Sequence, residues 1–206
     1  MMEYYIYNIP VFVMGKPQES VNIPSFCQNV EELLPVRLLR NVEVVYIGNF
    51  KDLRGKNAAF DSDSIYMSLE EPTNFDMLEN FIHEVGHSLA VDQGWQIYDD
   101  RLTSEFLSKR KRLRSMLESE GFEIDPLLYD STEYSKEFDY FLAKEVGYPL
   151  LLNLTMGLFV SPYGATSLRE YFANGFEKYF LDSPQVVNKI SPVLYSKIES
   201  ILDDEA

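Results

Sequence analysis

The chain contains two histidines, and a glutamate lies between them in the pentad His-Glu-Val-Gly-His at positions 83–87. On a helix, residues four apart project from the same face, so His83 and His87 are able to hold one metal ion together. Neutral imidazole is a favoured ligand of zinc, and Glu84 projects beside the position left for water. The spacing predicts a zinc site with Glu84 as general base. Because such a short motif also arises by chance, two ordinary histidines flanking a glutamate are the alternative.

The motif lies in a segment whose pattern predicts an amphipathic helix. Thr73 is placed to cap this helix, with Asp76 in its first turn. Apolar side chains then recur at steps of three and four residues, and we expect them to form one buried face: Phe75, Leu78, Ile82, Val85 and Leu89.

A catalytic zinc site usually takes three protein ligands and leaves one position for water. A continuation to a third histidine fails here, since Ala90 and Gln93 stand where that pattern requires Gly and His. The third ligand must then be a carboxylate, and we expect a glutamate on a later helix. The candidates are Glu105, Glu118, Glu120, Glu123, Glu133, Glu137, Glu145, Glu170 and Glu177.

The environment of each glutamate separates these candidates, because a ligand carboxylate belongs on the inward face of an apolar helix. Glu170 is favoured, since Leu168, Tyr171, Phe172, Phe176 and Phe180 surround it in the sequence. Glu177 lies two turns further along the same side, and its neighbour Lys178 indicates an exposed helix end. Glu145 is the next alternative, although pairing with Lys144 or with another surface charge is the favoured interpretation of this residue.

The segments 74–90 and 161–180 together resemble a known family. A helix with His-Glu-Val-Gly-His, then a tyrosine, then seven residues later Glu-aromatic-aromatic-Ala, is similar to the catalytic domain of anthrax lethal factor and to the Pro-Pro endopeptidases, which are gluzincins. In that family the glutamate is the third zinc ligand and the tyrosine faces the metal. The resemblance therefore implies a zinc endopeptidase with metal ligands His83, His87 and Glu170, the base Glu84, and Tyr163 as a catalytic hydrogen-bond donor to the oxyanion.

Two departures from the family pattern stand out. The gap from His87 to Glu170 is 83 residues (170 minus 87), so additional helices must be inserted between them. Asn174 stands where an acidic residue often follows the ligand, and as an amide it would orient a histidine more weakly.

Tyr163 has an alternative role, which is packing within the tight loop between Pro162 and Gly164. The preference of the Pro-Pro endopeptidases for their substrate is not extended to this chain.

Strand-like segments precede helical ones, which predicts an α+β fold. The resemblance implies a zincin-like single domain over 1–206, with a β-rich part and the motif helix at about 1–95 and a helical part at about 96–206. Expected strands are Tyr4–Met14, Val42–Gly48 and Ser64–Ser68; further expected helices are Leu102–Glu120, Glu133–Val146, Pro149–Phe159, Ser167–Leu181 and Pro184–Leu202. Because zincin peptidases pair substrate with a strand ahead of the motif helix, Ile65–Ser68 is the expected cleft edge, with an internal strand as the alternative.

Composition narrows the class of protein. The net charge of −15 argues against nucleic acid as a partner, and no apolar run approaches the roughly 18 residues of a membrane span. Without a recognisable signal peptide, the expected location is cytoplasmic, and the expected partner is a protein or peptide substrate. A non-catalytic zincin-fold binding or structural protein is the rival hypothesis, and the retained Glu84 favours the enzyme. The oligomeric state stays open.

Three remaining features have simple interpretations. Cys27, the single cysteine, is expected to be a small buried hydrophobe. Trp95 is expected in a loop and packed in the core, with a place in a substrate pocket as the alternative. The basic cluster at 109–114 is expected to be a solvated helix face paired with nearby glutamates, with a docking patch for an acidic partner as the alternative.

Overall fold

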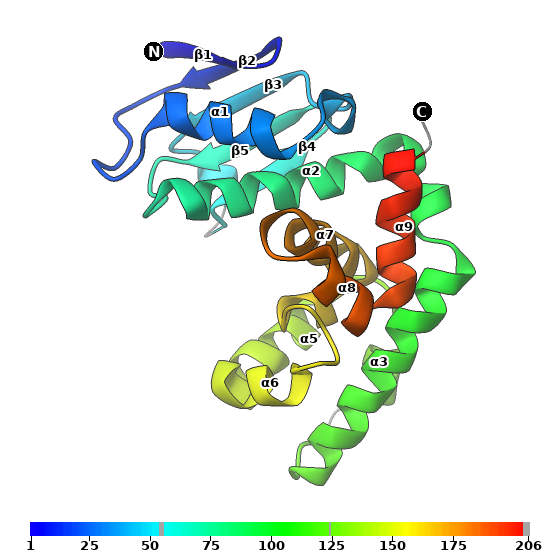
Figure 1. The fold of residues 1–206 in the computed structure, drawn as a ribbon. Coiled ribbons are helices and arrows are strands. Elements are labelled where there is room, and N and C mark those ends of the chain that lie inside the picture. The colour runs from blue at the N-terminus through cyan, green and yellow to red at the C-terminus, as the bar shows by residue number, and fades with distance from the viewer. Residues whose placement is uncertain (54–55, 124, 204–206) are drawn as a thin grey trace. The chain divides into compact units, whose positions relative to one another are not determined.

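The computed structural model describes residues 1–53, 56–123 and 125–203. The chain forms two compact units, Met1–Asp92 (the N-terminal unit) and Gln93–Ala206 (the C-terminal unit). The helix α2 (Asn74–Ile97) crosses the boundary between them (Figure 1). All five strands precede α2, and every α-helix except α1 (Ile23–Leu33) follows the last strand in the described residues, so the predicted α+β class is confirmed.

The N-terminal unit contains a mixed five-stranded sheet. Its strands are β1 (Met2–Ile6), β2 (Ile9–Val13), β3 (Val44–Gly48), β4 (Ala58–Asp61) and β5 (Ser64–Ser68), in the spatial order β1-β2-β3-β5-β4. The β2–β3 and β3–β5 pairs are parallel, whereas the β1–β2 and β4–β5 pairs are antiparallel. The predicted strand Tyr4–Met14 is a hairpin instead of one strand, because the chain turns at Tyr7, whose φ is 54°.

The strand at the far edge of this sheet is β4. The strand β5 is paired on both sides, so the prediction that Ile65–Ser68 forms the cleft edge is wrong and its alternative, an internal strand, is correct. This arrangement was not predictable from the local residues, because β4 has only four residues and lies within a polar, turn-rich segment.

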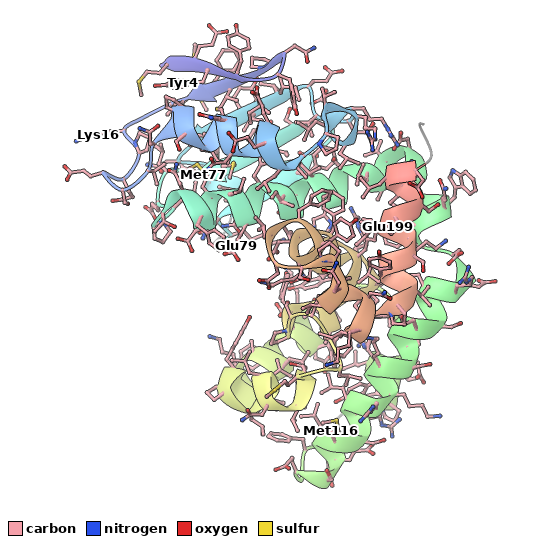
Figure 2. All side chains as sticks on the ribbon, in the orientation of Figure 1. Tyr4, Lys16, Met77, Glu79, Met116 and Glu199 are labelled. Atoms are coloured by element: carbon pink, nitrogen blue, oxygen red, sulfur yellow. The ribbon has the colours of Figure 1, made fainter. Side chains whose placement is uncertain are left out.

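The two faces of the sheet differ in their side chains. Buried aliphatic residues on one face pack with the helices α1 (Ile23–Leu33) and α2: Val11, Val13, Val45, Ile47, Ile65 and Met67. The two helices contact each other through Phe26 and Phe81, whose rings meet edge to face at 5.6 Å, and Met77 lies on the side of α2 toward α1 (Figure 2). The other face carries the stacked and partly exposed rings of Phe12, Tyr46 and Tyr66. Short 3-10 turns occur at Val36–Leu39 and Lys51–Leu53.

The described part of the C-terminal unit is helical. Its elements are α3 (Asp100–Ser119), α4 (Pro126–Asp130), α5 (Lys136–Tyr140), a π-helix (Phe141–Gly147), α6 (Tyr148–Thr155), a 3-10 turn (Tyr163–Ala165), α7 (Leu168–Leu181), α8 (Pro184–Ile190) and α9 (Pro192–Asp203). The predicted end of α3 is confirmed: Gly121 has φ +90°, and the N–H of Phe122 donates to the carbonyl of Leu117 at 3.0 Å, as in a Schellman motif.

Helix boundaries differ from the predictions where proline or an unusual turn intervenes. The predicted helix Pro184–Leu202 is broken at Ser191, because Pro192 starts a new helix. The predicted helix Glu133–Val146 begins later, at Lys136, and continues as the π-helix.

Within the described ranges, none of the helices combines the length and apolarity required to cross a membrane.

The basic cluster at 109–114 is not a uniformly solvated helix face. Lys109 and Arg110 are buried, and Lys109 Nζ donates to the carbonyls of Leu158 and Ile190 at 2.7 and 2.6 Å. The Arg110 guanidinium donates to the Ser131 carbonyl at 2.7 Å. The predicted surface pairing is correct for Arg114, whose Nε lies 2.6 Å from a carboxylate oxygen of Glu118. Two of the cluster's cations therefore serve the core of the C-terminal unit.

Candidate metal centre

The N-terminus of α2 is capped as the sequence predicts. The N–H of Asp76 donates to Thr73 Oγ1 at 3.2 Å, and the Thr73 hydroxyl donates to the Asp76 carboxylate at 2.5 Å. Both hydrogen bonds join Thr73 to Asp76, and the first gives a partner to a backbone N–H that has none within the first turn of the helix. The helix starts nine residues before the motif (83 minus 74), so the histidines lie inside a regular helix.

One face of α2 is buried, and the orientation of this face determines where the side chains of His83, Glu84 and His87 project. Leu78, Ile82, Val85 and Leu89 are buried as predicted, but Phe75 is 56 % exposed, so its predicted burial is wrong. Phe75 falls in the first turn of the helix, ahead of the stretch that packs on the sheet. After the motif, Asn41 Nδ2 donates to the Ser88 carbonyl at 3.0 Å and to Asp92 at 2.9 Å, which holds α2 against the N-terminal unit.

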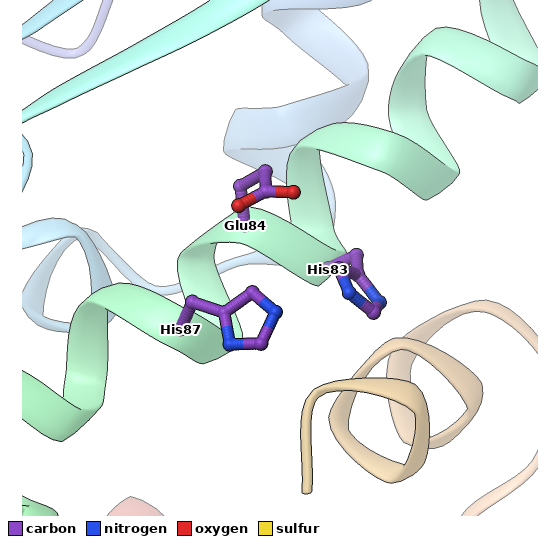
Figure 3. Close-up of side chains that lie close together, drawn as sticks. All are labelled: His83, Glu84 and His87. Atoms are coloured by element: carbon purple, nitrogen blue, oxygen red, sulfur yellow. The ribbon is translucent and has the colours of Figure 1, made fainter. Parts of the chain in front are cut away.

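His83, Glu84 and His87 form a tight cluster on α2. One potential ligand atom from each lies within 4.8 Å of the others, and all three side chains are partly buried. The imidazole centroids are 4.8 Å apart and the ring planes meet at 80°. Figure 3 shows both imidazoles leaving the helix on one side, with the Glu84 carboxylate projecting from another side. The predicted juxtaposition of the two imidazoles is therefore present.

Glu84 is also tied to the edge of the sheet. The N–H of Phe60 on β4 donates to Glu84 Oε2 at 2.8 Å. The register explains why this N–H points outward: Asn57 pairs with Ser68 through a 2.7 Å hydrogen bond, so the alternating pairs bonded to β5 are those at Asn57, Ala59 and Asp61. The N–H and C=O groups of Ala58 and Phe60 consequently face away from β5.

The candidate third ligands differ sharply in burial, and all nine lie in the described part of the chain. Glu170 is 9 % exposed and is the one classed as buried, while Glu105 and Glu177 are intermediate and the other six are exposed. Glu105 is occupied elsewhere: its carboxylate accepts from the Tyr171 hydroxyl at 2.8 Å and from the Val193 N–H at 2.9 Å. The burial that the apolar sequence around Glu170 predicts is thus observed.

Glu170 lies in the first turn of α7, and Tyr163 lies in the 3-10 turn packed against that helix. Ser167 caps α7 by accepting from the Glu170 N–H at 3.2 Å. Asn174 Nδ2 donates to the Glu170 carbonyl at 2.8 Å, and Asn174 Oδ1 accepts from the Ser161 hydroxyl at 2.5 Å. A Cβ on Gly164 would lie 3.7 Å from the Tyr171 Cα, so this turn sits directly on α7. Asn174 therefore joins the Tyr163 turn to the helix of Glu170.

Two further tyrosines lie near Glu170 without having been singled out in the sequence. Burial raises the pKa of Tyr98 to about 12, opposed by Arg169 and assisted by Glu170. Burial also raises the pKa of Tyr134 to about 12, with its bond to Asp139 and the field of Glu170 adding to the effect. The Thr132 carbonyl accepts from the Leu168 N–H at 2.9 Å, which places this loop beside the start of α7. Because the chain has 14 tyrosines, the sequence pattern does not distinguish Tyr98 and Tyr134 from the others.

The assignments of zinc, of Glu170 as its third ligand and of Tyr163 as oxyanion donor stay predictions. His83, Glu84 and His87 belong to the N-terminal unit, and Glu170 and Tyr163 belong to the C-terminal unit.

The burial of Cys27 and of Trp95 was also predicted from the sequence. Cys27 is buried as predicted. Trp95 is wrongly predicted as a core residue in a loop, because it lies within α2 with 81 % of its surface exposed.

Comparison with known proteins found no matching family model, no matching curated protein and no matching solved structure.

Proposed function

We propose that the chain is a zinc-dependent endopeptidase with a zincin-like fold. The observation that carries the proposal is the cluster of His83, Glu84 and His87, gathered within 4.8 Å on one helix. A surface pair of histidines would not require a capped helix, a packed inward face and a hydrogen-bonded glutamate between them. The acidic surface and the absence of nucleic-acid features leave a protein or peptide as the favoured substrate.

The residues present suit zinc. Two imidazoles four residues apart, completed by one carboxylate, make the donor set of many catalytic zinc sites. Glu170 supports the third position, because it is the one buried carboxylate among the nine candidate glutamates and lies on an apolar helix. When bound, the ion would supply Lewis-acid activation of water and of the peptide carbonyl.

The other side chains have distinct roles in this proposal. Glu84 Oε2 is held by the Phe60 N–H, so Oε1 is the atom that accepts the proton from the attacking water and passes it to the leaving amine. Tyr163 donates a hydrogen bond to the oxygen on which negative charge develops, an effect typically worth a few kcal/mol.

The edge strand β4 supports an extended peptide as the substrate. Its Ala58 N–H and C=O face away from β5, as the register requires, and the strand lies next to Glu84 through Phe60. An extended peptide adds to such an edge by main-chain hydrogen bonds. We therefore assign substrate pairing to β4, in place of the internal strand β5.

The proposal is tested by measuring bound zinc and peptide hydrolysis on the same preparations. Wild type should hold one zinc and cleave an unfolded protein substrate, and Glu84→Gln should retain zinc but lose activity by about a hundredfold or more. Glu170→Ala should lose both, whereas Glu145→Ala, which changes an exposed glutamate, should behave as wild type.

The contrary outcomes are equally clear. Zinc binding without hydrolysis in wild type would favour the non-catalytic binding protein. Unchanged zinc affinity after Glu170→Ala would overturn the third-ligand assignment and direct attention to Glu177, which is partly buried on the same helix.

A further inference from the structure

Glu71 is a fully buried acidic side chain in the N-terminal unit, with 0 % of its surface exposed. It lies three residues after the end of β5 and three before the start of α2. Acidic side chains are almost never buried unless other groups compensate for the lost hydration. The groups that contact the Glu71 carboxyl group therefore indicate its role.

Two carboxamides from different elements approach the Glu71 carboxyl group. Asn80 Nδ2, on α2, donates to Oε1 at 2.9 Å, and it also donates to the Asp76 carbonyl at 3.0 Å. Asn57 Nδ2, just before β4, donates to Oε2 at 3.5 Å. One carboxyl group thus connects the start of the edge strand with the motif helix.

The same two elements meet a second time at Glu84. Phe60 lies three residues after Asn57, and Glu84 lies one helical turn after Asn80. The contacts of Glu71 and the Phe60–Glu84 hydrogen bond therefore close a ring through β4 and α2. A change in one link alters the distance that the other must span.

Glu71 changes its charge in the neutral range. Burial raises the pKa of Glu71 to about 7; the hydrogen bond from Asn80 lowers it, and the nearby carboxylates Asp76 and Glu79 raise it further. Within the described residues, the charged groups found to act on Glu71 are these two acids of α2, and Asn57 on the β4 side is neutral. Ionisation turns the carboxamide contacts into charge-assisted hydrogen bonds, which are shorter and stronger.

We propose that Glu71 is a positioning residue, whose carboxyl group clamps β4 to α2 through Asn57 and Asn80 and whose ionisation adjusts the hydrogen bond between Phe60 and Glu84. The structural part of this inference concerns the N-terminal unit alone. Its consequence for catalysis rests on the proposed peptidase function.

The test follows the amide signal of Phe60 in two-dimensional nitrogen–proton NMR spectra as the pH is raised. The wild-type signal should shift with a midpoint near pH 7. Glu71→Gln, which keeps the shape but cannot ionise, should lose this step, and Glu70→Gln, which changes the adjacent exposed glutamate, should retain it. A step that persists in Glu71→Gln, or is missing from wild type, overturns the proposal.

A second variant keeps the test decisive should Glu71→Gln fail to fold. Asn80→Ala removes the hydrogen bond that lowers the pKa of Glu71, so the Phe60 midpoint should move to higher pH. An unmoved midpoint would show that the group sensed at Phe60 is not Glu71.

Activity measurements separate this inference from the proposed function. In an active peptidase, the pH profile of kcat should lose a step near pH 7 in Glu71→Gln. If no hydrolysis is found but the Phe60 step still depends on Glu71, the clamp stands and the peptidase proposal fails. If hydrolysis is found and the Phe60 step is independent of Glu71, the clamp fails and the peptidase proposal stands.

Discussion

At the scale of single residues, the Phe60–Glu84 hydrogen bond makes the two carboxylate oxygens of the proposed base Glu84 different from each other. Oε2 accepts from a backbone N–H at 2.8 Å, so the carboxylate has a defined orientation on the helix. A hydrogen bond to an ionised group typically contributes about 1.5–3 kcal/mol. Phe60 therefore contributes to the orientation of Glu84 through its backbone N–H, independently of its side chain.

Replacing Phe60 with proline should test this directly. Proline removes the N–H that Glu84 uses, and on the outward side of an edge strand it removes no bond to β5. Bound zinc should be unchanged, while kcat falls by about tenfold to a hundredfold because Glu84 is no longer oriented. Zinc analysis and steady-state kinetics on the same sample measure both quantities.

The neighbouring outward position predicts a different defect. Ala58→Pro removes a main-chain donor that an added substrate strand would use, so KM should rise with kcat little changed. If both proline variants lower kcat equally, the edge strand has been disrupted as a whole and the separate roles of Ala58 and Phe60 are wrong.

Cys27 should be unreactive in the folded protein. Burial raises the pKa of this thiol to about 12, and the field of Glu31 adds to the effect, so almost no reactive thiolate is present at neutral pH. A colorimetric thiol reagent at about pH 8 should label it at least a hundredfold more slowly in buffer than in concentrated urea. Rapid labelling in buffer would show that α1 opens easily.

The residues of the candidate site were predictable to different degrees for physical reasons. His83, Glu84 and His87 carry their spacing in the sequence, and the apolar neighbours of Glu170 indicate its burial. Phe60 was not predictable, because it acts through a backbone N–H that every non-proline residue has. Glu71 is one of 33 acidic residues, and only the fold shows that it is buried.

At the scale of elements, α3 joins the last two helices of the C-terminal unit. Lys109 donates to the Ile190 carbonyl at the end of α8 and to Ser191 Oγ at 2.9 Å. One turn earlier, Glu105 accepts from the Val193 and Leu194 N–H groups at the start of α9. Each charge thus complements the helix end that it contacts, a cation at a C-terminus and an anion at an N-terminus.

Lys109→Met should therefore destabilise the protein by about 2–4 kcal/mol, because three buried oxygen acceptors lose their donor. The matched change Lys111→Met, on the exposed side of α3, should stay within about 0.5 kcal/mol of wild type. Urea unfolding monitored by circular dichroism compares the two. Equal losses would mean that Lys109 contributes as an ordinary surface charge.

Element boundaries were predictable where local chemistry decides them. The Thr73 cap and Gly121, with its positive φ, mark helix ends in the sequence and in the structure. The break at Ser191 was missed although Pro192 follows it, and β4 was missed because a strand of four residues depends on its pairing with β5 more than on its own residues.

At the scale of the whole molecule, two electrostatic effects oppose folding as the pH rises. The chain carries a net charge of −15 at pH 7 and a pI near 4.5, so the repulsion between its carboxylates grows above that pH. Glu71 acts in the same direction through its burial. Salt separates the two effects, because it screens exposed charges well and buried ones poorly.

The pH dependence of stability should therefore contain a part that salt does not remove. The pKa of Glu71 is about 7 in the folded chain and roughly 4.3 in an unfolded one, so between these values the folded state binds more protons. Its contribution is fully present below about pH 4.3 and is lost as the pH rises from there through 7, a change of about 3–4 kcal/mol. Urea unfolding in about 0.5 M salt should show this decline in wild type and in Glu70→Gln but not in Glu71→Gln. A decline of equal size in all three proteins would mean that dispersed surface charge, and not Glu71, links the stability of this acidic chain to pH.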